Sequence, residues 1–68
     1  MSLAAMGRRV GPFVLFADDD GLRHAVRLSV IMALSDADSH QATTIIMMPG
    51  GRIVLIREPL EEVVGWFS

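Results

Sequence analysis

Residues 43–57 have the sequence TTIIMMPGGRIVLIR, in which two apolar runs rich in β-branched residues flank a proline and two glycines. Such runs favour extended backbone, and a short connection that contains glycine lets the chain reverse at little steric cost. Pro49 ends the first run, because proline has no N–H to donate to a strand ladder. The stretch therefore predicts a β-hairpin with strands at 43–48 and 52–57.

A short helix is predicted immediately after this hairpin. Pro59 suits the first turn of a helix, and two glutamates follow it at the end where the helix dipole favours carboxylates. An apolar stripe with helical spacing runs through Leu60, Val63, Val64 and Phe67. A helix of roughly nine residues is too short to be stable alone in water. We therefore expect it to pack its stripe against a sheet.

The first half of the chain is compatible with two structures. Residues 13–17 are apolar and predict a strand, and Asp18 to Gly21 predict a turn. The segment from Leu22 to Ser35 fits either two strands or one amphipathic helix. Strands are favoured, because an Asp-Gly pair between two apolar runs is typical of a hairpin. Residues 36–41 are polar and predict a loop in either case.

Together these segments predict one small, mainly β domain of the α+β class. The favoured architecture is an antiparallel meander of about five strands with one short C-terminal helix. If the segment from Leu22 to Ser35 is helical, the element order becomes β-α-β-β-α. The domain is expected to span residues 12–68, with residues 1–11 as a flexible N-terminal leader.

The size and composition of the chain suggest how such a domain is stabilised. The chain has 68 residues, is 51% hydrophobic and contains no cysteine. A domain of this size buries only about 60% of the surface that its unfolded chain exposes, so it often depends on a disulfide, a metal or a partner chain. Disulfides and thiolate zinc sites are excluded. No unbroken apolar run exceeds residues 30–34, far below the ~20 residues that span a bilayer. We expect a cytoplasmic protein with no membrane partner.

The hairpin strands are apolar on both faces, which predicts self-association. One face carries Ile46, Met48, Val54 and Ile56, and the opposite face carries Ile45, Met47, Ile53 and Leu55. Strands of this kind are normally covered on both sides, and one short helix covers one side. A second copy of the chain is the simplest cover for the other, with a different protein as a further option. The predicted shared surface is the first of the two sets, or else the opposite one, and a homodimer is the favoured assembly.

The sequence predicts neither an enzyme nor a cofactor site. Asp18, Asp19, Asp20 and Gly21 match only part of a calcium loop, since Phe16 and Arg27 fall where ligands are required. Asp36, Asp38 and His40 alternate in a predicted loop and lack a fourth ligand. No serine or histidine lies in a nucleophile motif. We therefore expect a non-enzymatic interaction or regulatory module with no catalytic, cofactor or metal residues.

An alternative function is nucleic-acid binding through a partial arginine patch. The chain has six arginines and no lysine, and the patch would consist of Arg23, Arg27, Arg52 and Arg57. However, the formal net charge is −2, which gives no general attraction to nucleic acid. The charge balance thus argues against a nucleic-acid partner, and nucleic-acid binding is the second hypothesis.

The order of scaffold residues also resembles that of a known group of proteins. A turn glycine at Gly21, an apolar pair at 30–31, a hairpin whose second strand follows a glycine at 51, and an acidic helix start at 57–64 occur in this order. In these features the chain resembles small flagellar-regulator FlbD-like proteins and, more loosely, the β-rich LytTR module. The resemblance covers residues from Asp20 onward and implies a small bacterial regulator. No functional residue is carried over, because the matching residues form the scaffold.

Overall fold

The computed structural model describes residues 7–68, which fold into six β-strands and one α-helix. The elements are β1 (Arg8–Val10), β2 (Phe13–Ala17), β3 (Arg23–Arg27), β4 (Ala33–Asp36), β5 (Thr44–Met48), β6 (Arg52–Ile56) and α1 (Leu60–Trp66). Two single-turn 3₁₀ helices, η1 (Leu28–Val30) and η2 (Pro49–Gly51), lie between strands. The predicted mainly β fold with one C-terminal helix is confirmed.

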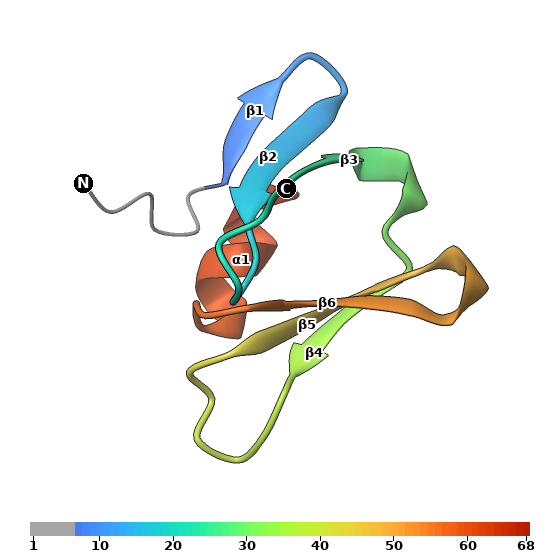
Figure 1. The fold of residues 1–68 in the computed structure, drawn as a ribbon. Coiled ribbons are helices and arrows are strands. Elements are labelled where there is room, and N and C mark those ends of the chain that lie inside the picture. Colours follow the sequence, from blue (N-terminus) through green and yellow to red (C-terminus); the bar gives the residue numbers. More distant parts are fainter. Residues whose placement is uncertain (1–6) are drawn as a thin grey trace.

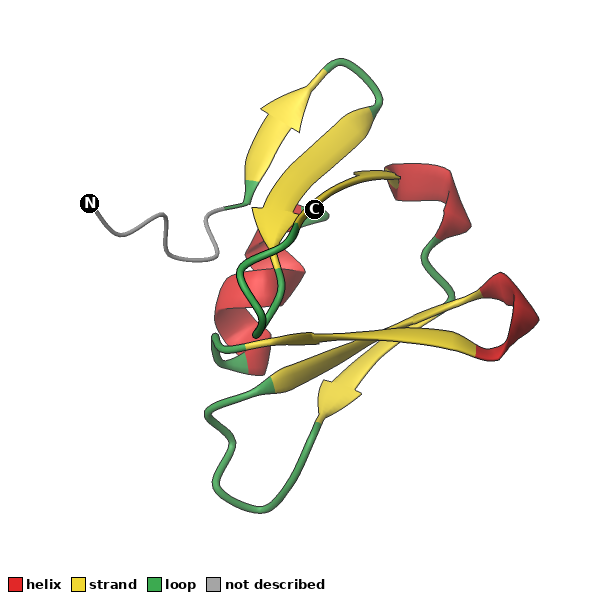
Figure 2. Ribbon diagram, viewed as in Figure 1, coloured by secondary structure: helices red, strands yellow, loops and turns green. Residues whose placement is uncertain are grey.

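The strands form two antiparallel sheets of three strands each. The first sheet has the order β1-β2-β3 and the second the order β4-β5-β6. Figures 1 and 2 show the two sheets as separate units, with α1 beside them and the chain passing from one to the other through η1. The single five-stranded meander expected from the sequence is therefore replaced by two three-stranded sheets.

The hairpin at residues 43–57 is confirmed as β5 and β6. Met48 pairs with Arg52, and the connection between them is the 3₁₀ turn Pro49–Gly51. Gly50 and Gly51 have φ angles of +81° and +74°, which glycine adopts without the steric cost that a Cβ would add. The two glycines are thus what allows so short a reversal.

The segment from Leu22 to Ser35 is extended, so the strand interpretation is confirmed and the helical alternative is not. It differs from the expectation in one respect, because η1 interrupts it between β3 and β4. This turn redirects the chain, and β3 and β4 consequently lie in different sheets. Strand β4 also extends to Asp36, which pairs with Thr44, although residue 36 was predicted to begin a loop.

The sixth strand is β1, which the sequence did not predict. Its residues pair with Phe13 to Leu15 of β2, and Gly11 and Pro12 form the two-residue reversal between the strands. Gly11 has a φ angle of +58°, which suits such a turn. Residues 8–10 thus form a strand within the range assigned to the flexible leader, while residues 1–6 of that range lie outside the described residues.

The hydrophobic core joins the inner faces of both sheets to α1. Its buried members are Val14, Phe16, Val26, Ile46, Val54, Ile56, Val63 and Trp66, with Thr44 as a buried polar side chain. Within α1 the buried stripe differs from the predicted one, because Trp66 is buried and Val64 is 45% exposed. The ring of Trp66 stacks on that of Phe16 with centroids 5.9 Å apart. The outer face of each sheet, which points away from this core, remains accessible.

Among the described residues, no helix is long and apolar enough to cross a membrane.

Candidate functional site

The outer face of the second sheet carries an uncharged, mostly apolar surface. Two rows of directly paired residues point away from the core on this side. We call these residues the apolar face: Ala33, Met47 and Ile53 in one row, and Ser35, Ile45 and Leu55 in the other. Met47 is 37% exposed and Ile53 is 58% exposed. Large aliphatic side chains therefore meet solvent at one end of the sheet.

The residues predicted to form the shared surface lie on the other side of this sheet. Ile46 and Ile56 are fully buried, Val54 is 8% exposed, and Met48 packs partly buried against the core. Side chains buried within one chain are not available for contact with a second copy. The predicted surface is thus corrected to the opposite set, Ile45, Met47, Ile53 and Leu55. The sequence left both sets open, and the packing of α1 and β2 decides between them.

A hollow along the edge of β6 is lined by both acidic and basic residues. It is lined by the turn residues Asp18, Asp19 and Asp20, by His24, and by Met48 and Arg52 to Leu55. Within residues 7–68 the only ion pair joins His24 to Asp18, so Arg52 has no carboxylate partner in this part of the chain. Arg52 is paired with Met48 and therefore lies on the side of the second sheet opposite the apolar face.

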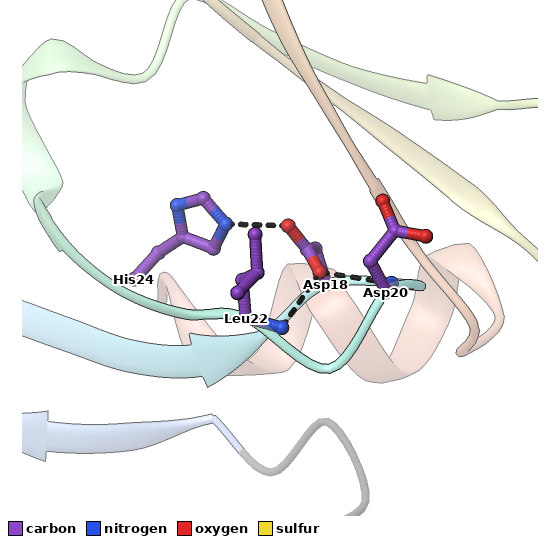
Figure 3. A network of polar contacts seen from close by, with 4 residues as sticks. All are labelled: Asp18, Asp20, Leu22 and His24. Carbon is purple, nitrogen blue, oxygen red and sulfur yellow. Dashed lines mark hydrogen bonds and ion pairs between the residues drawn. The ribbon is translucent and has the colours of Figure 1, made fainter.

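Asp18 organises the turn between β2 and β3, as Figure 3 shows. Its carboxylate accepts hydrogen bonds from the backbone N–H groups of Asp20, at 2.9 Å, and Leu22, at 3.0 Å. The second carboxylate oxygen lies 2.7 Å from Nε2 of His24. The hydrogen bond with His24 is the largest cause that lowers the pKa of Asp18 below 3.8, and the two backbone N–H groups act in the same direction.

Two contacts hold the ring of His24 in place, one with Phe16 and one with the Asp18 carboxylate. Its ring stacks on Phe16, with centroids 5.6 Å apart and an angle of 22° between the planes. The β2 and β3 register places Phe16 directly opposite His24. The side chain of His24 is half-buried between the core and the acidic turn.

The acidic clusters serve local backbone structure. Asp18, Asp19 and Asp20 are the one group within residues 7–68 whose side chains are close enough together to share a cation. Asp18 already accepts three hydrogen bonds from within the chain. In the loop between β4 and β5, the Asp38 carboxylate accepts a hydrogen bond from the backbone N–H of His40. Both arrangements are typical of aspartates that stabilise turns.

The predicted arginine patch is divided between two parts of the molecule. Arg23 and Arg27 lie on one face of β3, two positions on either side of Ala25. Arg52 begins β6 in the second sheet, and Arg57 follows the end of that strand. The four arginines therefore do not form one surface. The residue that joins Arg23 and Arg27 on the same face of the first sheet is Arg8, from the strand that the sequence did not predict.

Comparison of the chain with protein-family models, curated proteins and solved structures found no match.

Proposed function

We propose that this chain is a non-enzymatic interaction module that forms a homodimer through the apolar face. The observation that carries the proposal is the combination of burial and exposure on one hairpin. Ile46 and Val54 point into the core, whereas Met47 and Ile53 beside them remain exposed. Water contact with these aliphatic side chains is unfavourable by about 25 cal/mol per Å² of apolar surface, so covering them stabilises an assembly.

A second copy of the chain fits this face better than an unrelated surface. Around a two-fold axis the same patch of each copy forms the contact. An uncharged patch therefore meets an uncharged patch, and no unpaired charge is buried between them. Arg52 and Asp36, the charged residues of the three strands, are paired in rows on the other side of the sheet. Contact between two copies would therefore cover apolar side chains from both, which stabilises the assembly.

The order of scaffold residues supports a regulatory role. The order of turn glycines, hairpin and acidic helix start resembles that of FlbD-like regulators, and LytTR modules have a looser likeness. A module of this type acts by binding other macromolecules, for which an oligomeric scaffold is suitable. We therefore propose a small bacterial regulator that works in the cytoplasm as a dimer.

The test is the mass of the protein in solution before and after a charge is placed on the apolar face. Light scattering coupled to size-exclusion chromatography should give twice the chain mass for the wild type. Ile53→Glu should give the single-chain mass, because the exposed side chain at 53 can carry a charge in the monomer and not in the dimer. Circular dichroism should show that the variant keeps its strands.

Val64→Glu is the matched control. Val64 is also a partly exposed aliphatic residue, at 45%, but it lies on α1 and outside the apolar face. This variant should keep the wild-type mass. A wild-type protein that stays at the mass of one chain at high concentration would contradict the proposal, and so would an Ile53→Glu variant that remains a dimer.

A further inference from the structure

The outer face of the first sheet carries one arginine in each of its three rows. Cross-strand pairing places Ala17 beside Arg23, Arg8 beside Leu15 and Ala25, and Val10 beside Phe13 and Arg27. Directly paired residues point to the same side of a sheet. We call this set the arginine face: Arg8, Val10, Phe13, Leu15, Ala17, Arg23, Ala25 and Arg27.

The arginine face has no negative charge within it, although the whole chain has a net charge of −2. All three arginines are exposed. Within residues 7–68 the only ion pair is the one between His24 and Asp18, so none of the three is neutralised by a carboxylate in this part of the chain. The acidic side chains lie in the β2–β3 turn, in the segment around residues 36–38, and around α1. The face is therefore a local concentration of positive charge.

The spacing of the arginines suits an extended anion better than a single small one. Arg23 and Arg27 are four residues apart on one strand, which corresponds to about 13 Å along β3. Arg8 lies two strands away from β3, at a distance of about 10 Å across the sheet. Three guanidinium groups separated in this way can each contact a different phosphate. A single phosphate or carboxylate would engage one of them.

An aromatic ring lies among these charges. The guanidinium carbon of Arg27 is 5.4 Å from the centroid of the Phe13 ring, a cation–π arrangement, and Phe13 is half-buried. Leu15 lies beside Phe13 on the same face and is also half-buried. A planar guanidinium and a phenyl ring are the two kinds of side-chain surface on which unpaired bases stack.

From these observations we infer that the arginine face binds single-stranded nucleic acid. Arg8, Arg23 and Arg27 would contact phosphates through their N–H groups, and a base would stack on the outer face of the Arg27 guanidinium, which lies over the Phe13 ring. A duplex is less suited, because its bases are already stacked on one another and cannot stack on a side chain of the sheet. An acidic peptide would use the charges but has no base to stack on Arg27. This inference does not depend on the proposed dimer, since the apolar face lies on the other sheet.

The experiment measures binding of the full chain to a short fluorescein-labelled single-stranded DNA by fluorescence anisotropy over a range of salt concentrations. Three phosphate contacts to a single strand predict that log K falls with log salt with a slope of about −2. The double variant Arg23→Ala/Arg27→Ala should reduce this slope to about −1 and weaken binding at low salt. Phe13→Leu should weaken binding without changing the slope.

The chain supplies its own matched control in the variant Arg52→Ala/Arg57→Ala, which removes the same charge from outside the arginine face. This variant should retain wild-type binding, and circular dichroism should show that all variants are folded. The inference is wrong if no binding occurs at low salt, or if the control variant loses as much affinity as Arg23→Ala/Arg27→Ala. It is also wrong if duplex DNA of the same sequence binds more tightly, or if polyglutamate displaces the DNA as well as unlabelled single strand does.

Discussion

The backbone N–H of Asp19 donates a hydrogen bond of 3.0 Å to the carbonyl oxygen of Leu55. Asp19 belongs to the turn between β2 and β3, and Leu55 lies on β6, the edge strand of the second sheet. The bond therefore connects the two sheets through the turn that Asp18 organises. The bond also gives a partner to one carbonyl group at the open edge of β6. Unpaired backbone groups on such an edge can hydrogen-bond to a strand of another chain.

The first prediction concerns the loss of stability in acid. Because the pKa of Asp18 is lowered in the folded state, its carboxylate favours folding at pH values above 3.8. This contribution is lost as the pH falls through the lowered pKa. Asp18→Asn keeps an acceptor for the turn but has no charge to lose. We expect a weaker decline of its unfolding free energy between about pH 5 and about pH 2, measured by urea denaturation.

Asp20→Asn is the control for this measurement, because the side chain at 20 is exposed and makes no hydrogen bond with His24. Its acid profile should follow that of the wild type. Equal profiles for the wild type and Asp18→Asn would show that the contact between Asp18 and His24 contributes nothing to acid stability.

The second prediction concerns the buried hydroxyl of Thr44. The Thr44 side chain is fully buried, and its Oγ1 donates a hydrogen bond of 2.8 Å to the carbonyl oxygen of Glu58. This bond ties β5 to the segment that precedes α1. Thr44→Val keeps the shape but removes the donor, which should lower the unfolding free energy by about 1–3 kcal/mol. Thr43→Val, at the half-buried neighbour, should change it by less than about 0.5 kcal/mol. Equal effects in urea denaturation would contradict this role.

The local structure of the second half of the chain could be predicted, because short-range chemistry decides it. Pro49, Gly50 and Gly51 determine where β5 ends and how the chain reverses. Which face of the hairpin is buried could not be predicted, since both faces are apolar and only the packing of distant elements distinguishes Ile46 from Met47. The hypothesis of a doubly apolar hairpin was therefore sound, but the set of residues assigned to the free surface was the wrong one.

The polar features depend on contacts between distant residues and were harder to predict. The turn at Asp18 followed from its sequence, whereas the contact with His24 requires the register in which Phe16 faces His24. Strand β1 was missed because Arg8 to Val10 has only one apolar residue and no strand pattern of its own. Its pairing with β2 brings Arg8 level with Leu15, and the arginine face exists only once that pairing is known.

The third prediction concerns the close approach of Gly7 to α1. A Cβ atom on residue 7 would overlap the ring of Trp66, which is buried and cannot swing away freely. Gly7→Ala should therefore displace the indole and lower the unfolding free energy by about 1–3 kcal/mol. Tryptophan fluorescence should shift toward that of an exposed indole, because Trp66 is the only tryptophan in the chain.

Gly65→Ala provides the opposite case within α1. A Cβ atom at residue 65 would meet no other atom within 4 Å, and alanine is favoured over glycine in a helix. This variant should raise the unfolding free energy by about 0.5–1 kcal/mol. If both glycine variants changed stability in the same direction, the position of residue 7 against Trp66 would not hold.

The last prediction uses two adjacent residues of β6 to test which face of the sheet is buried. Val54 is 8% exposed and Ile53 is 58% exposed, so the same substitution places a charge in the core or in water. A buried, unpaired carboxylate costs more than about 4 kcal/mol, which approaches the whole stability of a small domain. Val54→Glu should therefore be unfolded by circular dichroism and show no cooperative thermal transition. Ile53→Glu should melt cooperatively, and whether it is a monomer or a dimer reports separately on the apolar face. A folded Val54→Glu beside an unfolded Ile53→Glu would mean that the hairpin presents its other face to the core, and the assignment of the free surface would be reversed.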